Sequence, residues 1–281
     1  MNVIVLPFDP IAVRLGPLVL AWHGIFTAAG VLAGTYAAAR LAPSAGIESE
    51  AVWAGAWWMV LGGIVGARFL FAAEHPAAFA GEPWRLVLIN EGGISVFGAV
   101  LGGMAAGALW AHRAGIAPVR LLDAAAPGFL LGQAIGRIGD IINGEHLGAH
   151  AAGLAWAVVY THPDTLGEAG VPVHPAVAYE LLWDLAAAAA AAWLLRRAAG
   201  PPVARRQRRP MPGVALWSAL VFYGLGRFWV GFYRLDQPAA FGLGLAQVLG
   251  LGILPGALVG LWLAVRSGRR SAATCPPFTT S

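Results

Sequence analysis

Residues 132–148, GQAIGRIGDIINGEHLG, place charged side chains at the end of an otherwise apolar segment. Arg137 and Asp140 are three residues apart, so in a helix both side chains lie on the same face. Asn143 and the glycine after it form a helix-stop signal. The pattern predicts an apolar helix that ends near residue 143 and carries polar groups on its last two turns.

The composition of the whole chain indicates that this helix lies in a membrane. Of the 281 residues, 58% are hydrophobic and 11% are charged, and the mean hydropathy is +0.68. A soluble domain carries about 25% charged residues. The chain is therefore expected to be a membrane protein. The basic run RRQRR at 205–209 is then most simply a topology signal, and no nucleic-acid partner is expected.

Apolar runs long enough to cross a bilayer divide the chain into helices. Each needs about 20 residues, which predicts about seven transmembrane helices, at 15–41, 51–72, 93–112, 121–142, 175–195, 213–232 and 242–265. The expected fold is all-α and polytopic. We expect a single transmembrane domain over 1–270 and a disordered cytoplasmic tail over 271–281.

The distribution of arginines predicts the orientation of these helices, because cytoplasmic loops carry an excess of basic residues. Most arginines outside the predicted helices lie at one end of them, whereas Arg14, Arg85 and Arg234 lie at the other. We therefore expect the N-terminus outside and the C-terminus in the cytoplasm. The loops at 73–92 and 143–174 are then expected to form a small periplasmic cap.

Ionisable residues within the predicted helices need a separate explanation, because a charge inside a membrane is costly. The arginines are Arg68, Arg137 and Arg227, each near the outer end of its helix, and the carboxylates are Asp140, Glu180 and Asp184. The three positive charges equal the three negative charges in number, so one interpretation is that they form ion pairs that hold the helix bundle together. The other is a ligand site, because glycine-flanked arginines at headgroup depth suit a phosphate.

Two further motifs place polar residues in the outer half of the membrane. In VHPAVAYELLWD, 173–184, the proline after His174 predicts the first turn of a helix, with Tyr179 and Glu180 just inside it. In YGLGRFWVGFYR, 223–234, Arg227 lies beside glycines and among aromatic residues. Both motifs are expected to contribute to the same outer region as Arg137.

Glycines recur at a spacing of four, which lets helices approach closely. These glycines are Gly62 with Gly66, Gly98 with Gly102, and the row Gly128, Gly132 and Gly136. Gly136 and Gly139 also flank Arg137, where they are expected to leave room for a bulky ligand.

With these residues in view, the sequence resembles the phosphatidylglycerol–prolipoprotein diacylglyceryl transferases over nearly its whole length. FDPIAVRLGPLVLAWHG, 8–24, is similar to the opening segment of that family, and GRIGDIINGE, 136–145, resembles its signature. HPAVAYE, 174–180, and YGLGRF followed by FYR, within 223–234, resemble two later motifs. The signature is long and specific.

The resemblance implies an enzyme of the bacterial inner membrane whose active site faces the outer leaflet. It implies transfer of the diacylglyceryl group of phosphatidylglycerol to the lipobox cysteine thiol of a prolipoprotein signal peptide, the first step of lipoprotein maturation, with release of glycerol 1-phosphate. No metal or cofactor is expected. By motif position, Arg137 and Arg227 are the expected catalytic phosphate ligands, and Glu145 and His174 are candidates for the base or its support. The other expected substrate-binding residues are Asp140, Asn143, Gly148, Tyr179, Glu180 and His23.

The chain departs from the usual pattern of the family at several positions. Asp140 replaces an asparagine of the signature, and a carboxylate repels a phosphate unless it is paired with Arg137. His23, Phe97 and Gly231 replace a tyrosine, a histidine and a glutamate, and His23 is a candidate for proton handling. These changes leave open a divergent member with weak or altered activity, or with another acceptor. A non-enzymatic lipid- or anion-binding membrane protein is the alternative, although the nonpolar inner halves of the helices argue against a transport path.

Overall fold

The computed structural model describes residues 3–16, 18–88, 93–200 and 211–273. Within these residues the chain forms seven α-helices, with short paired strands at one end. The helices are α1 (Trp22–Ala45), α2 (Ser49–Glu74), α3 (Val96–Arg113), α4 (Pro118–Asn143), α5 (Ala176–Ala199), α6 (Val214–Gly231) and α7 (Leu245–Ala273). The predicted all-α class and the order of the helices are confirmed.

Several of these helices have the length and composition of membrane spans. Five of the described helices, α1, α2, α5, α6 and α7, are long and apolar enough to cross a membrane. Helix α4 has 26 residues but carries Arg120, Asp123, Arg137 and Asp140 along its length. Helix α3 is shorter and ends in His112 and Arg113. The chain is therefore a polytopic membrane protein, and α4 is its most polar helix.

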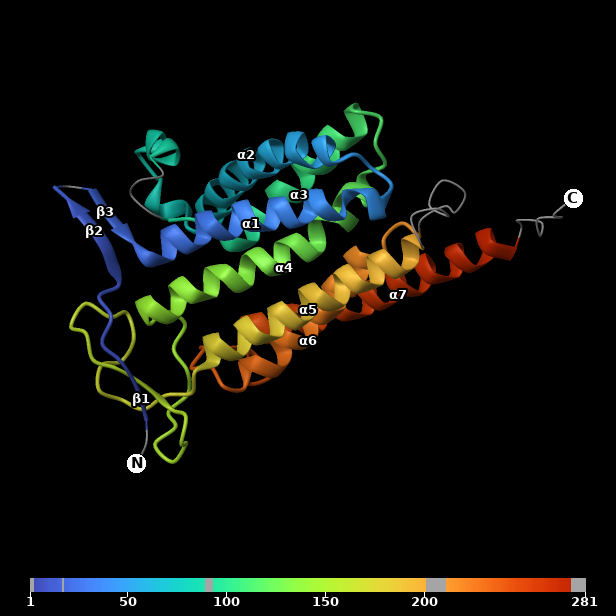
Figure 1. Ribbon diagram of the computed structural model, residues 1–281. Coiled ribbons are helices and arrows are strands. Elements are labelled where there is room, and N and C mark those ends of the chain that lie inside the picture. Colours follow the sequence, from blue (N-terminus) through green and yellow to red (C-terminus); the bar gives the residue numbers. More distant parts are fainter. Residues whose placement is uncertain (1–2, 17, 89–92, 201–210, 274–281) are drawn as a thin grey trace, which may run out of the picture.

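The helices form two adjoining groups, α1 to α4 and α5 to α7 (Figure 1). Helix α1 packs along α4, α2 along α3, and α6 along α7, while α4 also contacts α5 and α6 and so joins the groups. The strands and the yellow-green segment after α4 lie at one end of the helices (Figure 1). The start of α5 and the ends of α4 and α6 meet at that same end.

Glycines allow the closest helix contacts, as their spacing predicted. A Cβ atom built on Gly128 of α4 would lie 2.2 Å from the backbone oxygen of Gly34 of α1. A Cβ on Gly66 of α2 would lie 2.3 Å from the oxygen of Gly98 of α3. Gly136 differs, because nothing lies within 4 Å of a Cβ at that position. The first two members of the α4 row therefore pack against α1, and the third does not.

The first helix begins later than the sequence predicted. Strands β2 (Ile11–Leu15) and β3 (Leu18–Ala21) pair in the antiparallel sense, and α1 begins at Trp22. Gly16 in the turn has φ +59°, a conformation that favours glycine. The prediction of helix from residue 15 is wrong because a short apolar run looks alike in a strand and in a buried helix.

The segment after α4 packs against the start of the chain. Strand β1 (Ile4–Leu6) pairs in parallel with β4 (Val158–Tyr160). A third pair joins β5 (Pro238–Ala240) to β6 (Leu243–Gly244), before α7. The other predicted cap loop contains two short 3-10 helices, η1 (Pro76–Ala78) and η2 (Pro83–Val87). Residues 89–92 of that loop, the basic run 205–209 and residues 274–281 of the predicted tail lie outside the described residues.

The apolar core lies at the end of the bundle away from the strands. It contains Leu41, Leu121, Leu195 and Val214. Asp123 lies in this region and is 1% exposed. Its two carboxylate oxygens accept hydrogen bonds, at 2.5 to 2.9 Å, from the backbone N–H groups of Gly213, Ala215 and Leu216. This carboxylate of α4 therefore caps the first turn of α6, whose N–H groups have no partner within their own helix.

Candidate active site

Arg137 lies near the end of α4 and is 7% exposed. Its Nη1 donates a hydrogen bond to Oδ2 of Asp140 at 2.7 Å, as the spacing of the two residues predicted. Its Nη2 lies 2.7 Å from Oε2 of Glu180 on α5. Arg137 therefore pairs with a carboxylate of its own helix and with one of the neighbouring helix.

Glu180 pairs with arginines from three parts of the chain. In addition to Arg137, its Oε1 accepts hydrogen bonds from Nη1 of Arg227 at 2.8 Å and from Nη1 of Arg234 at 3.2 Å. Glu180 is 5% exposed, so these pairs are shielded from solvent. We refer to Arg137, Arg227 and Arg234 around Glu180 as the arginine cluster.

Arg234 also belongs to this cluster, although its position in the sequence predicted only an outer loop residue. Two hydrogen bonds to Asp236, at 2.8 and 3.0 Å, hold its guanidinium in place. The spacing of seven residues between Arg227 and Arg234 corresponds to about two helical turns. This spacing was the available signal, although Arg234 lies just beyond the end of α6 at Gly231.

Arg68 is the buried arginine that lies apart from the cluster. Its guanidinium donates to backbone oxygens of Leu86 at 2.9 Å, of Gly93 at 2.8 Å and of Leu88 at 3.1 Å. It also lies over the ring of Phe79. The interpretation that Arg68 belongs to the set that faces Asp140, Glu180 and Asp184 is therefore wrong. Arg68 instead fixes the connection between α2 and α3 against the end of α2.

A second group of polar residues surrounds Asp140. Nδ1 of His23, in the first turn of α1, lies 2.5 Å from Oδ1 of Asp140. Glu145 lies next to this pair, with Oε2 at 3.7 Å from the same histidine nitrogen. The Nδ2 group of Asn143 donates to the other oxygen of Glu145 at 2.9 Å. The predicted site residues of the signature are thus brought together with His23, which is far away in sequence.

His146 connects this group to the arginine cluster. Its Nδ1 accepts from Nη2 of Arg234 at 3.4 Å, and its Nε2 lies 3.7 Å from Oδ2 of Asp140. Burial, together with the charges of Arg137 and Arg234, lowers the pKa of His146 below its ordinary value of 6.5. The ring is therefore neutral at neutral pH.

His174 and Tyr179 lie in an aromatic cluster beside the arginine cluster. The two rings pack together with Tyr233, which directly precedes Arg234. The hydroxyl of Tyr179 accepts a hydrogen bond from Trp156 at 2.8 Å and lies 3.4 Å from Nδ1 of His174. Among the described residues, neither side chain forms a hydrogen bond with an arginine of the cluster.

Three glycines near the site have packing roles. A Cβ on Gly148 would lie 1.9 Å from the backbone oxygen of His174, so Gly148 lets two site segments approach. A Cβ on Gly139 would lie 2.6 Å from Cα of His23. The expectation that Gly139 leaves room for a ligand is therefore wrong, because the start of α1 fills that space. Gly231 similarly makes room for the buried side chain of Gln247. The Nε2 group of Gln247 donates a hydrogen bond to the backbone oxygen of Phe228 at 3.2 Å.

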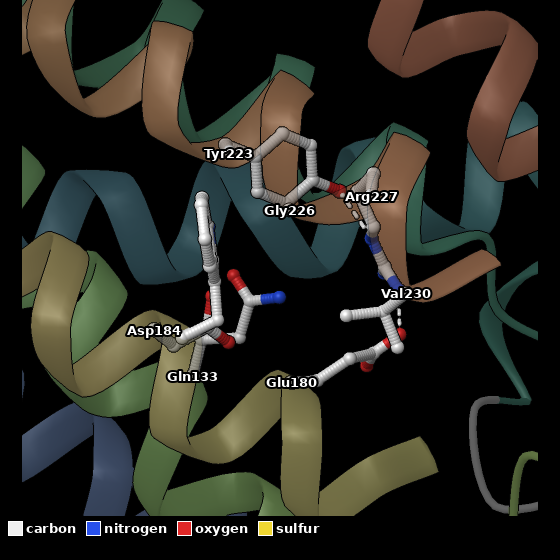
Figure 2. Close-up of a pocket in the computed structure, with 8 residues that line it drawn as sticks. Gln133, Glu180, Asp184, Tyr223, Gly226, Arg227 and Val230 are labelled. Atoms are coloured by element: carbon white, nitrogen blue, oxygen red, sulfur yellow. Dashed lines mark hydrogen bonds and ion pairs between the residues drawn. The ribbon is translucent and has the colours of Figure 1, made fainter. Parts of the chain in front are cut away.

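A small cavity lies beside Glu180 and Arg227, which line part of it (Figure 2). It has room for about one water molecule. Gln133, Asp184 and Tyr223 line it, and the hydroxyl of Tyr223 accepts a hydrogen bond from Nε of Arg227 at 3.2 Å. Oε1 of Gln133 and Oδ2 of Asp184 are buried and have no hydrogen-bond partner within the described part of the chain. Asp184 therefore lies beneath the cluster rather than in its ion pairs.

This arrangement is suited to holding an anion at the end of a helix bundle. Guanidinium groups bind phosphate oxygens through parallel N–H donors. Arg227 is the most accessible of the cluster, with a side chain that is 19% exposed, against 8% and 9% for Arg137 and Arg234. The structure therefore defines a polytopic membrane protein that gathers three arginines around one buried carboxylate at one end of its helices.

Comparison with known proteins identifies the family. The family model for prolipoprotein diacylglyceryl transferase matches residues 10–266, so the chain belongs to that family. A phosphatidylglycerol–prolipoprotein diacylglyceryl transferase of Gloeobacter violaceus is 35% identical over 94% of this chain and 96% of its own length. Relatives of the same name from Synechococcus elongatus and Bacillus anthracis are 34% and 30% identical, and cover 90% and 88% of this chain and 87% and 88% of their own lengths.

Proposed function

We propose that the protein transfers the diacylglyceryl group of phosphatidylglycerol to the lipobox cysteine of a prolipoprotein signal peptide. The reaction releases glycerol 1-phosphate. The names of the relatives support the donor and the class of acceptor. The arginine cluster supports the donor independently, because phosphatidylglycerol presents a phosphodiester anion at the level where apolar helices end.

The observation that carries the proposal is the convergence of three arginines on Glu180. Glu180 holds the guanidinium groups in place before a substrate arrives. The Nη2 group of Arg227 has no partner among the described residues, and its side chain is partly exposed. Arg227 is thus the proposed first contact of the lipid phosphate, and Arg137 is the deeper one.

The chemistry requires a cation beside the leaving group. The thiolate sulfur attacks the glyceryl carbon, the carbon–oxygen bond to the phosphate breaks, and negative charge grows on the departing phosphate. Arginines that are already oriented stabilise that charge in the transition state. Asp140 is paired with Arg137 and bonded to His23, so it does not face the phosphate as an isolated negative charge.

We further propose that the site faces the outer leaflet of the bacterial inner membrane, with the N-terminus outside and the C-terminus in the cytoplasm. The excess of arginines at the opposite end of the helices supports this orientation. The chain would then be one transferase domain over 1–270, with a cytoplasmic tail. Asn143, Glu145, His174 and Tyr179 are proposed to line the path of the acceptor peptide, and Gly148 to hold their backbone together.

A second candidate function is lipid or anion binding without catalysis. The paired state of the cluster favours it, because each arginine already has Glu180 as a carboxylate partner and these pairs hold α4, α5 and the end of α6 together. Both candidates predict binding of phosphatidylglycerol, and only the transferase predicts a modified thiol.

The test is a transfer assay in vesicles of phosphatidylglycerol with a lipobox peptide, read by mass spectrometry of the peptide. We expect a gain of one diacylglyceryl group with the wild type and with Arg14→Ala, an exposed arginine paired with Asp164 outside the site. We expect loss of the gain with Arg137→Ala. That change takes one partner from each of two buried carboxylates, while Asp140 keeps His23 and Glu180 keeps Arg227 and Arg234. The cost is therefore below the about 3–5 kcal/mol of a fully broken buried pair, and thermal unfolding checks the fold.

Arg227→Lys complements this variant, because it keeps the charge and loses the planar fork. We expect it to fold normally and to react slowly. EDTA should leave the wild-type rate unchanged, since the proposed chemistry uses no metal or cofactor. A folded wild type that binds the lipid and never modifies the peptide would instead identify the non-enzymatic function.

A further inference from the structure

We propose that His23 is the general base that takes the proton of the acceptor thiol, and that Asp140 is the residue that positions it. This inference rests on the proposed function and adds to it the group that activates the nucleophile. It concerns two residues at which the chain departs from the usual pattern of its family. Contacts of both side chains with the site support it.

The geometry of the pair gives the two ring nitrogens of His23 different roles. Nδ1 lies 2.5 Å from Oδ1 of Asp140, a carboxylate that is 3% exposed. A carboxylate at this distance holds the proton on Nδ1 and so leaves the lone pair on Nε2. The side chain of His23 is 44% exposed, and within the described part of the chain the one polar contact of Nε2 is Oγ1 of Thr27 at 3.5 Å. Nε2 is therefore free to accept a proton from a substrate.

Other candidate bases in the described site are less suited to the task. The carboxylate of Glu145 accepts a hydrogen bond from Asn143. His146 accepts from Arg234 and has a lowered pKa, caused by burial and by two nearby arginines. His174 packs against the rings of Tyr179 and Tyr233. His23 alone in this set combines an exposed nitrogen with a carboxylate on the other side of the ring.

Asp140 also links the base to the phosphate site. Its Oδ1 holds His23 and its Oδ2 accepts from Nη1 of Arg137 at 2.7 Å. One buried carboxylate thus orients both the base and an arginine that would hold the leaving group. The proposed base and the proposed phosphate ligand are thus held close together by one side chain, so that both can act on one bound substrate.

The proposed step balances without any co-reactant. The S–H bond breaks as Nε2 of His23 takes the proton, and the sulfur lone pair forms the carbon–sulfur bond. The carbon–oxygen bond breaks and its electron pair stays on the phosphate of glycerol 1-phosphate. The imidazolium then returns its proton to the phosphate or to water, which restores the neutral ring.

A metal ion is a competing role for the same residues, because ligand atoms of His23, Asp140 and Glu145 lie within 4.8 Å of one another. The separation of 2.5 Å between His23 and Asp140 argues for a direct hydrogen bond. Two ligands at about 2 Å from one tetrahedral zinc would be roughly 3 Å apart. Inhibition of the wild type by EDTA, with recovery on addition of Zn²⁺, would overturn the proposal.

The experiment compares two acceptors in the transfer assay. One peptide carries the lipobox cysteine, and the other carries selenocysteine, whose selenol is already ionised at neutral pH. We expect His23→Ala to slow the cysteine peptide by about 10²–10⁴-fold and to slow the selenocysteine peptide far less. Added imidazole should restore part of the rate with the cysteine peptide. Asp140→Asn should show the same contrast between acceptors to a smaller degree.

The matched control is His150→Ala, because His150 is also exposed and bonded to a carboxylate, Glu168, at 2.8 Å. We expect it to behave as wild type with both peptides. Equal slowing of both peptides by His23→Ala, without imidazole rescue, would show a structural role and overturn the proposal. A wild-type rate in folded His23→Ala would also overturn it and would leave the proposed function intact. The proposed function itself fails only if the folded wild type transfers to neither peptide.

Discussion

Replacement of Gly128 by alanine tests whether backbone contact between α1 and α4 holds the bundle together. A Cβ atom at this position would lie 2.2 Å from the carbonyl oxygen of Gly34 and 3.2 Å from Cβ of Ala38. Carbon and oxygen atoms that are not bonded need about 3.3 Å or more, so the two helices must separate by about 1 Å. Both neighbours are on α1, and a carbonyl oxygen of a helix has little freedom to move aside.

The expected free-energy change has two terms of opposite sign. Overpacking of a tight contact costs about 1–3 kcal/mol. Glycine to alanine inside a helix gains up to about 1 kcal/mol of helix propensity. Gly136→Ala provides the control, because it is two turns later on α4 and has nothing within 4 Å of its Cβ. The difference in unfolding free energy between the variants therefore isolates the overpacking cost.

Thermal unfolding of the purified protein in detergent measures this difference. We expect Gly136→Ala to unfold at or slightly above the wild-type temperature, and Gly128→Ala several degrees below it, at about 2–4 °C per kcal/mol. Gly34→Ala should behave like Gly128→Ala, because its Cβ would lie 2.5 Å from the oxygen of Gly128. Equal Tm values for Gly128→Ala and Gly136→Ala would refute the reasoning, since they would show that α1 and α4 do not depend on backbone contact.

Three further predictions concern residues near the ends of the helices. Asp123→Ala leaves the first turn of α6 without its cap, so we expect the free energy of unfolding to fall by at least about 1–3 kcal/mol. Asp123→Asn should lower it less. An unchanged free energy of unfolding would show that water replaces the carboxylate. Arg68→Ala removes the donor to the carbonyls of Leu86 and Leu88, so limited proteolysis should cut residues 76–88 faster, while unchanged cleavage would mean that other contacts suffice. His146 should titrate below its ordinary value of 6.5 in NMR of the labelled ring, because burial and two arginines disfavour its charged form. As the pH falls through about 6.5, His146 therefore takes up a proton in the unfolded chain before it does so in the folded protein. Acid should then destabilise the wild type more than His146→Gln. A ring that titrates at or above 6.5 would contradict the structure.

The sequence predicted the helices well, because apolar runs of membrane-spanning length have few alternatives in a bilayer. It failed at residues 15–21, where the same apolar character serves a strand. The row at Gly128 and Gly132 correctly indicated a close helix crossing. The spacing rule could not show that Gly136 points away from α1, whereas Gly139, one turn further, continues the contact at His23.

In the site, the sequence predicted the contacts within one helix and missed those between helices. The local contact between Arg137 and Asp140 follows from helical spacing. The pairing of Arg137 with Glu180 depends on how α4 packs against α5, which spacing does not encode. The roles of Arg68 and Arg234 were predicted from their positions in the membrane alone. Arg68 was therefore expected in the charged site, where the structure has Arg234 instead. Asp123 was missed because its partners, backbone N–H groups at the start of α6, leave no mark in the sequence.

The partners of the charges on α4 have a consequence for how the chain enters the membrane during synthesis. Each arginine or aspartate at the centre of a lone helix costs about 2.5–3.5 kcal/mol in insertion. Asp140 of α4 is one partner of Arg137, but its second partner, Glu180, and the N–H groups that satisfy Asp123 belong to α5 and to the start of α6, which leave the ribosome later. Helix α4 is therefore poorly suited to release into lipid on its own. We expect it to remain at the insertion machinery, or beside α1, until the next two helices have been made and the group can move into the bilayer together.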